Sequence, residues 1–171
     1  MVRVGIIGVG VMGAGHARFI KEFVADAEVT ALFDVDLKKI SDLANELGTV
    51  TLQTTDAESL MNHPDVDAII IASPDQLHVE HLRVAIKCKK PILCEKPIAT
   101  NLEDARTIAQ EIKEYEKAVG KQMIHFGFMR RFDPSYREVR RLIQSGDFGK
   151  PTFFRTITRN VASTGATTPG L

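Results

Sequence analysis

The sequence predicts an α/β protein built on a Rossmann fold, a doubly wound parallel sheet with helices on both faces. Segments with strand and helix patterns alternate along most of the 171 residues. The segment "DAIIIAS", residues 67–73, carries consecutive apolar residues, which is typical of a parallel strand buried on both faces. A further strand pattern, Val2–Ile7, runs directly into a glycine-rich turn. Together these features indicate βαβ units with right-handed crossovers.

The first half of the chain contains three predicted strands and three predicted helices. Asp36 is placed to cap the second helix, and Gly48 is placed to end it. An apolar stripe along that helix indicates one buried face. In order, the predicted elements are strand 2–7, helix 13–23, strand 29–33, helix 37–47, strand 50–53 and a short helix 57–61.

The second half continues the alternation up to residue 128. Strand 67–73 is followed by a helix that begins near Asp75, and strand 91–94 comes next. Thr100 and Glu103 have the spacing of a capping box, which predicts a helix starting at this point. A last strand is expected within "MIHFGF", residues 123–128.

The pattern changes after Gly127, so we predict a dinucleotide-binding domain over residues 1–127. Residues 128–171 are interpreted as the beginning of an incomplete second α+β domain. Asp133 and Pro134 predict a helix start and Gly146 its end, and residues 149–160 have a strand pattern. Residues 161–171 show no core pattern, so the second domain is expected to be truncated.

Composition excludes several classes of function. The net charge is zero and no nucleic-acid motif is present, which argues against a nucleic-acid partner. No apolar run approaches the roughly 18 residues of a membrane span. The histidines are scattered without ligand spacing, so no metal site is predicted. Cys88 and Cys94 are interpreted as two reduced thiols of a cytoplasmic protein.

A glycine motif predicts a dinucleotide site. "GVGVMG", residues 8–13, is G-x-G-x-x-G, and it lies between a predicted strand and a predicted helix. In such a motif Gly8 forms the tight turn, Gly10 lets the backbone approach a pyrophosphate, and Gly13 allows the helix to pack closely. The helix start, including Val11 and Met12, offers N–H groups to the anion.

Asp34 indicates which dinucleotide is bound. It ends the second predicted strand, 21 positions after Gly13, and its carboxylate can accept hydrogen bonds from a ribose diol. The same carboxylate would repel a 2′-phosphate, so NAD is the predicted cofactor. Lys38 and Lys39 keep NADP as the alternative, although two lysines here also fit a solvated helix face.

Two further polar segments fall at predicted strand ends. Ser73–Pro74 follows one strand, and Glu95–Lys96 follows another within "ILCEKPIAT", residues 92–100. Ligands of open parallel sheets bind beyond the carboxyl ends of the strands. The two charges at 95 and 96 are therefore expected to face a ligand crevice instead of the core.

These segments carry a family resemblance. "GIIGVGVMGAGHA", "IIIASPDQLHVEHLRVAIKCKKPILCEKPIAT" and "HFGFMRRFDPSYREVRRLI" together resemble the Gfo/Idh/MocA oxidoreductases over about residues 2–160, and among them the inositol 2-dehydrogenases. The resemblance implies an enzyme that oxidises a secondary alcohol of a polyol or sugar, or reduces the ketone, with a nicotinamide cofactor. The general chemistry agrees, because alcohol oxidation releases a proton and needs a positioned base.

The resemblance also implies roles for individual residues. Lys96 matches the catalytic lysine beside the nicotinamide, which holds the substrate hydroxyl and takes part in proton transfer. Glu95 matches the glutamate near the nicotinamide ribose. The remaining implied contacts are Ser73 and His78 on a cofactor-binding loop, where Asp75 replaces the commoner asparagine, and Arg130 and Asn160 toward the substrate.

Alternatives remain at several of these positions. Arg130 also fits a basic helix surface together with the other arginines of residues 130–141. His16 and His125 are expected to be packing residues.

One departure from the family is expected to matter for activity. The family carries D-x-x-x-H beside the substrate in its second domain, and this sequence has no such pattern. We therefore expect the chain to be the NAD-binding part of a longer enzyme, with little or no polyol turnover by itself. The alternative is a stand-alone NAD-binding sensor, which would not need Lys96. A homo-oligomer remains open for the full-length enzyme.

Overall fold

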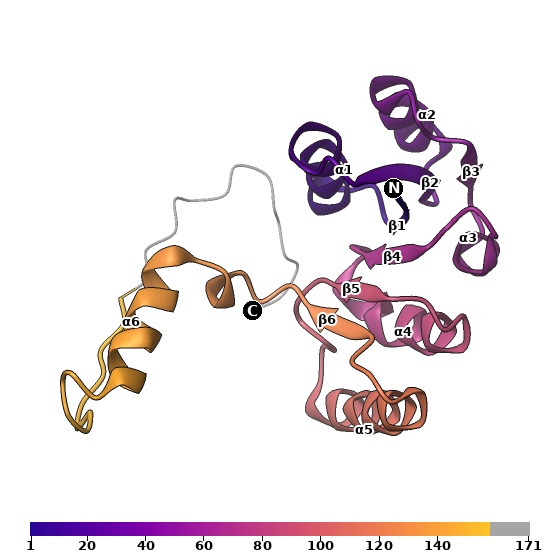
Figure 1. Cartoon of the computed structure of the whole chain (residues 1–171). Helices are drawn as coiled ribbons and strands as arrows, with labels where there is room; N and C mark the ends of the chain where they lie inside the picture. The colour runs from indigo at the N-terminus through magenta and orange to yellow at the C-terminus, as the bar shows by residue number, and fades with distance from the viewer. Residues whose placement is uncertain (158–171) are drawn as a thin grey trace. The chain divides into compact units, whose positions relative to one another are not determined.

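Six parallel strands form the central sheet of the first structural unit (Figure 1). The structure, a computed structural model, describes residues 1–157 and divides into the units Met1–Phe128 and Met129–Leu171. The strand order is β3-β2-β1-β4-β5-β6, which confirms the predicted Rossmann fold. The strands are β1 Val2–Ile7, β2 Ala27–Phe33, β3 Leu52–Thr54, β4 Ala68–Ile71, β5 Ile92–Cys94 and β6 Ile124–Phe126.

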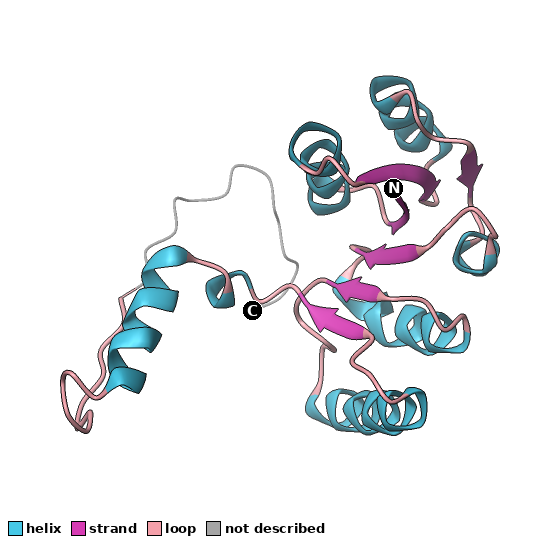
Figure 2. Ribbon diagram, viewed as in Figure 1, coloured by secondary structure: helices cyan, strands magenta, loops and turns pink. Residues whose placement is uncertain are grey.

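Helices cover both faces of this sheet, as Figure 2 shows. Helices α1 (Val11–Phe23) and α2 (Leu37–Leu47) pack on one face. On the other face lie α3 (Ala57–Asn62), α4 (His78–Lys87) and α5 (Leu102–Val119). Each face has its own buried apolar cluster, so the sheet separates two cores.

The alternation of side chains along β1 explains how one strand serves both cores. Val4 and Ile6 join the cluster under α1 and α2, whereas Ile7 joins the cluster under the other helices. Ile6 and Ile7 are both fully buried. Because burying one such side chain contributes about 1.5–3 kcal/mol, this short strand stabilises both layers.

Several predicted boundaries were wrong by two or three residues. Helix α1 begins at Val11 instead of Gly13, and β2 begins at Ala27. Strand β3 occupies Leu52–Thr54 because these residues pair with the end of β2, a long-range contact that periodicity does not report. A short 3-10 turn, Asp75–Leu77, precedes α4.

The predicted capping box at the start of α5 was also wrong. Asn101, not Thr100, is the N-cap: its Oδ1 accepts a hydrogen bond from the Asp104 N–H at 2.9 Å. The Asn101 amide donates in turn to Asp104 Oδ2 at 2.6 Å. Asn101 and Asp104 thus satisfy each other across the first turn, so the helix starts one residue later than Thr100 predicts.

Caps at two other helices confirm the prediction. Asp36 Oδ1 accepts from the N–H groups of Lys38 and Lys39, and α2 ends at Gly48 in the left-handed conformation. In the second unit, Asp133 and Pro134 begin α6 (Pro134–Ser145), and Gly146 follows its last residue. Short-range cap signals therefore located both of these helices.

The second unit contains α6 and, before it, a 3-10 turn at Met129–Arg131. The predicted strand 149–160 does not form in residues 149–157, and residues 158–160 lie outside the described part. Phe153, Phe154 and Ile157 are exposed. A strand requires hydrogen-bonding partners, and within residues 129–157 no other strand offers them.

The corrected cap of α5 can be tested with a matched pair of variants. Asn101→Ala should lower the free energy of unfolding by about 1 kcal/mol, because it removes the N-cap acceptor. Thr100→Ala should change it by less than about 0.5 kcal/mol. Urea unfolding followed by circular dichroism measures both values. A larger loss in Thr100→Ala than in Asn101→Ala would contradict the assignment.

Candidate functional site

The carboxyl ends of five strands lie in one row across the sheet. Parallel pairing aligns, from β2 to β6, Phe33, Ile7, Ile71, Cys94 and Phe126. The ladder continues one residue further: Gly8 N–H donates to Phe33 O at 2.8 Å, and Glu95 N–H donates to Ile71 O at 2.9 Å. The polar residues that follow each strand therefore meet at one edge, where open parallel sheets bind ligands.

The glycine turn after β1 needs two of its three glycines for internal fit. Gly8 has φ +93°, and a Cβ there would stand 2.7 Å from the Ala72 carbonyl oxygen. A Cβ on Gly13 would lie 1.8 Å from the Gly8 carbonyl oxygen. Apart from Gly10 itself and its two chain neighbours, no atom of residues 1–157 lies within 4 Å of the Cβ position of Gly10. The turn thus keeps β4 and α1 close while Gly10 leaves its outer side open to a ligand.

Helix α1 begins at this turn with an exposed N-terminus. Gly10 is the N-cap and supplies no side-chain acceptor. The first intrahelical bond runs from Ala14 N–H to Gly10 O at 2.9 Å. The N–H groups of Val11, Met12 and Gly13 therefore have no acceptor within the helix, which is the arrangement that binds a phosphate.

The Asp34 carboxylate at the end of β2 is held by two backbone groups. Val9 N–H donates to Oδ2 at 2.9 Å, and Asp36 N–H donates to Oδ1 at 3.0 Å. These two bonds fix the carboxylate beside the glycine turn. Its remaining lone pairs can accept hydrogen bonds from a diol.

A cleft of about 420 Å³ joins these groups. Lys39 also lines it, with its Nζ 3.9 Å from Asp36 Oδ2. Lys38 instead pairs with Asp42 on the helix surface. The lining residues are Gly8, Gly10, Val11, Met12, Phe33, Asp34, Val35, Lys39, Ala72, Ser73, Pro74 and Leu77. Apolar walls with a few polar groups suit the nucleoside end of a dinucleotide.

Two buried histidines organise the loop after β4. The Ser73 hydroxyl lies 2.8 Å from His81 Nδ1. His78 Nε2 lies 2.9 Å from Ser73 O, and its Nδ1 lies 2.6 Å from Pro97 O. A carbonyl oxygen only accepts and a neutral imidazole carries one N–H, so the neutral form of His78 donates to one of these two carbonyls and contacts the other. The fully buried His78 side chain thus contacts the loop after β4 and the loop after β5, and its predicted contact with the cofactor stays a prediction.

The turn after β5 separates its two charged side chains. Glu95 is buried and Lys96 is exposed. Glu95 Oε1 accepts a hydrogen bond from His16 Nε2 at 2.8 Å, so the prediction that His16 only packs was wrong. The Lys96–Pro97 peptide bond is cis. In the sequence, His16 was marked only by its position three residues after Gly13. That position does not predict a hydrogen bond to a residue 79 positions away.

Comparison with known proteins agrees with this geometry. Residues 2–122 match the family model GFO_IDH_MocA, described as an oxidoreductase family with an NAD-binding Rossmann fold. The chain belongs to this family. Its glycine turn, Asp34 and the cleft all lie within the part of the chain that matches the NAD-binding Rossmann domain of this family.

Relatives of this family member include inositol dehydrogenases. Inositol 2-dehydrogenase 3 of Saccharopolyspora erythraea is 37% identical over 159 residues, 93% of this chain and 45% of that protein. The inositol 2-dehydrogenase of Acidothermus cellulolyticus is 37% identical over 94% of this chain and 46% of its own length. The chain therefore spans about half the length of the curated relatives it matches.

A solved structure shows the same fold with ligands. The myo-inositol dehydrogenase of Lactobacillus casei, crystallised with NAD(H) and myo-inositol, superposes with a TM-score of 0.81 at 32% identity. The match covers 88% of this chain and 43% of that one.

Arg130 lies in the second unit of this Gfo/Idh/MocA chain and has partners there. Its Nη1 donates to Asp133 Oδ2 at 3.1 Å, and its guanidinium lies 5.1 Å from the centre of the Tyr136 ring. Asn160 lies outside the described residues. The substrate contacts of both residues stay predictions.

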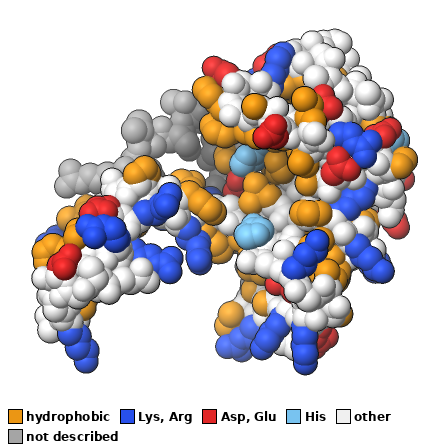
Figure 3. Space-filling view, viewed as in Figure 1, with side chains coloured by type: hydrophobic (Ala, Val, Ile, Leu, Met, Phe, Trp, Pro, Cys, Tyr) orange, Lys and Arg blue, Asp and Glu red, His pale blue; other side chains and the backbone are white. Residues whose placement is uncertain are grey.

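Residues 1–157 of the chain contain neither a membrane-spanning helix nor a cluster of metal-ligating side chains. Within residues 1–157, no helix has the length and apolar character needed to cross a bilayer. The same residues contain no group of three or more histidine, cysteine or acidic side chains placed to hold a metal ion. On the face drawn in Figure 3, charged side chains of both signs are interspersed over the Rossmann unit.

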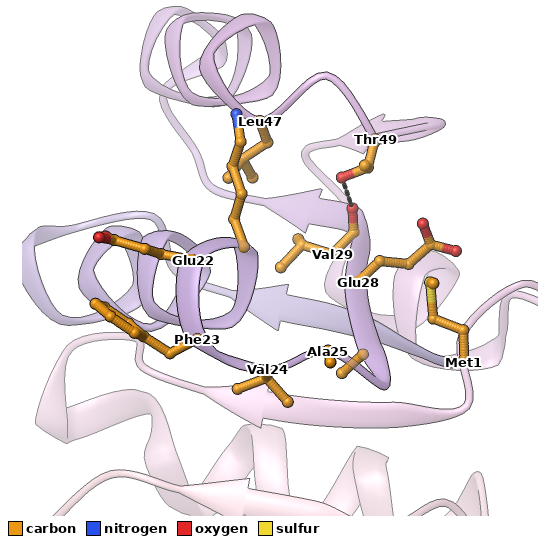
Figure 4. A pocket seen from close by; sticks show the side chains of 11 residues that line it. Met1, Glu22, Phe23, Val24, Ala25, Glu28, Val29, Leu47 and Thr49 are labelled. Atoms are coloured by element: carbon orange, nitrogen blue, oxygen red, sulfur yellow. Dashed lines mark hydrogen bonds between the residues drawn. The ribbon is translucent and has the colours of Figure 1, made fainter.

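Another hollow, of about 370 Å³, lies at the opposite end of β2 (Figure 4). Phe23, Val24 and Ala25 contribute apolar walls, and the Thr49 hydroxyl donates to Val29 O at 2.7 Å. It lies away from the carboxyl ends of the strands. None of the predicted site residues within 1–157 lines it, so it is separate from the cleft beside the glycine turn.

Acidification should destabilise the protein partly through His81. Burial lowers the pKa of His81 from the ordinary 6.5, and the Glu80 carboxylate opposes this shift. Below 6.5 the unfolded chain takes up a proton that folded His81 does not, so stability falls as the pH is lowered. His81→Asn lacks this proton uptake, and its unfolding free energy should fall less between about pH 7.5 and 5.

Urea unfolding at several pH values measures the difference between wild type and His81→Asn, which cancels the contribution of other titrating groups. The exposed His125 provides a control, since His125→Asn should retain the pH dependence that His81 adds. Parallel curves for wild type and His81→Asn would contradict the prediction.

Proposed function

We propose that this chain is the cofactor-binding part of an NAD-dependent dehydrogenase that oxidises a secondary alcohol of a polyol such as inositol. The observation that carries the proposal is the position of Lys96. It follows β5 in the same row of strand ends that carries the glycine turn and Asp34. A module that only senses NAD has no need of an exposed amine there.

The proposed cofactor contacts follow from the geometry of the strand ends. The first turn of α1 binds the pyrophosphate through the N–H groups of residues 11–13. Asp34 accepts hydrogen bonds from the adenosine ribose, and Ser73 borders the same cleft. Glu95 lies farther along the row, on the side proposed for the nicotinamide ribose. NAD supplies the hydride acceptor when it is bound.

Lys96 is the proposed catalytic residue. Its amine is exposed, and no ion pair holds it within the described residues. The amine can bind the substrate hydroxyl and take part in removing its proton while the carbon loses hydride. Arg130 and Asn160 are proposed to contact the polyol.

NAD is favoured over NADP because Asp34 holds a negative charge where a 2′-phosphate would lie, although Lys39 lines the same cleft. A cytoplasmic location is supported by Cys88 and Cys94, which are both free thiols.

The choice of cofactor can be tested at Asp34. Calorimetric titration of wild type should show tighter binding of NAD than of NADP. Asp34→Asn should weaken NAD binding by about tenfold, because it removes a charged hydrogen-bond acceptor. The difference between the affinities for NAD and NADP should therefore become smaller. Asp42→Asn, which removes an exposed carboxylate on α2, is the control and should leave both affinities unchanged. Tighter binding of NADP by wild type would overturn the assignment.

If Lys96 is catalytic, its removal should lower the turnover of the enzyme without lowering its affinity for NAD. Lys96→Ala should lower NADH formation from myo-inositol by at least about 100-fold and leave NAD affinity within about threefold. The comparison is made in a form of the protein that shows measurable turnover, with exposed Lys121→Ala as the control. Undiminished turnover in Lys96→Ala would refute the catalytic role, and NAD binding without any polyol oxidation in every form tested would favour the sensor.

A further inference from the structure

The Glu95 carboxylate is a buried charge at the edge of the proposed active site. The residue is only 8% exposed, whereas its neighbour Lys96 is exposed. Burying an ionised carboxylate is costly unless hydrogen-bond donors meet its oxygens. The groups that meet this carboxylate therefore decide where it can lie.

Each oxygen of Glu95 has one donor among the described residues. His16 Nε2–H donates to Oε1 at 2.8 Å, and the backbone N–H of Lys96 donates to Oε2 at 3.3 Å. Because a carboxylate only accepts, the His16 proton must lie on Nε2. A carboxylate has about four acceptor positions, so capacity remains for the hydroxyl groups of a ribose.

Gly127 bounds the carboxylate on another side. A Cβ on Gly127 would stand 2.9 Å from Glu95 Oε2 and 3.0 Å from both Oε1 and Cδ. The Gly127 N–H donates to Cys94 O at 2.8 Å, which holds the backbone of residue 127 beside the end of β5. Any side chain at 127 would thus have to displace the carboxylate or the strand end.

We infer that His16 is a positioning residue, which together with the bare backbone of Gly127 holds Glu95 toward the nicotinamide half of the cofactor site. The inference rests on the proposed function. His16 belongs to α1, the helix whose first turn is proposed to bind the pyrophosphate. One side chain therefore links the phosphate-binding helix to the turn that carries Lys96.

The inference predicts that loss of His16 weakens binding of the nicotinamide half of the cofactor and leaves binding of the ADP half unchanged. NAD contains the nicotinamide ribose and ADP lacks it, while both contain the adenosine and the pyrophosphate. His16→Leu should weaken NAD binding by about tenfold and change ADP binding by less than about twofold. His16→Gln, which retains an N–H donor, should recover part of the NAD affinity. A role in folding alone would weaken both ligands equally.

Gly127→Ala gives an independent test that leaves His16 intact. Its Cβ should push the carboxylate away and reproduce the selective loss of NAD affinity. Gly15→Ala, next to His16, is the matched control, because among residues 1–157 no atom outside the local backbone of α1 and the two chain neighbours lies within 4 Å of a Cβ at that position. It should leave the affinities for NAD and ADP unchanged.

A double-mutant cycle shows whether His16 acts through Glu95. Glu95→Gln should itself weaken NAD binding, and His16→Leu should then add little, since its partner is already changed. Calorimetric titration with NAD and ADP measures all variants, after thermal unfolding has shown that each is folded. Additive effects, equal losses for NAD and ADP, or no loss in His16→Leu would overturn the inference. Failure of wild type to bind NAD would instead overturn the proposed function.

Discussion

The parallel register of the sheet is the constraint on which the site depends. Five strands end in one row, and backbone hydrogen bonds continue the ladder to Gly8, Glu95 and Gly127. Strands in a sheet are spaced by about 4.8 Å, so residues far apart in sequence become neighbours without any side-chain bond between them. A shift of one residue in any strand would move its polar terminus out of this row.

Packing on both faces of the sheet then fixes the loops at this edge. Helix α1 covers one face and supplies His16 to Glu95, while α4 covers the other and supplies His78 and His81. His78 reaches the backbone after β4 and after β5, so the two loops are tied through one imidazole. Polar side chains that are buried near the site thus serve mainly to hold backbone and carboxylate, and the exposed Lys96 is left for chemistry.

The second unit shows what local sequence signals achieve without a tertiary partner. Asp133 and Pro134 begin α6 because caps act within one turn of the helix. Residues 149–157 have a strand pattern and form no strand, since an extended segment is stable only when another strand satisfies its backbone. Helix α6 likewise has an apolar stripe, which includes Tyr136, Val139 and Ile143, and these side chains are exposed. An amphipathic helix buries its apolar face only when another element packs against it.

The sequence by itself determined the order of the elements in the Rossmann unit, the glycine turn, Asp34 and the position of the Glu95–Lys96 turn at a strand end. These depend on short-range rules of periodicity, caps and turn residues, which one stretch of chain displays alone. The tertiary structure decided that Asn101 caps α5, that His78 is buried between two carbonyl groups, and that His16 bonds Glu95. Such contacts depend on strand register and helix placement together, and no local pattern encodes a hydrogen bond across 79 residues.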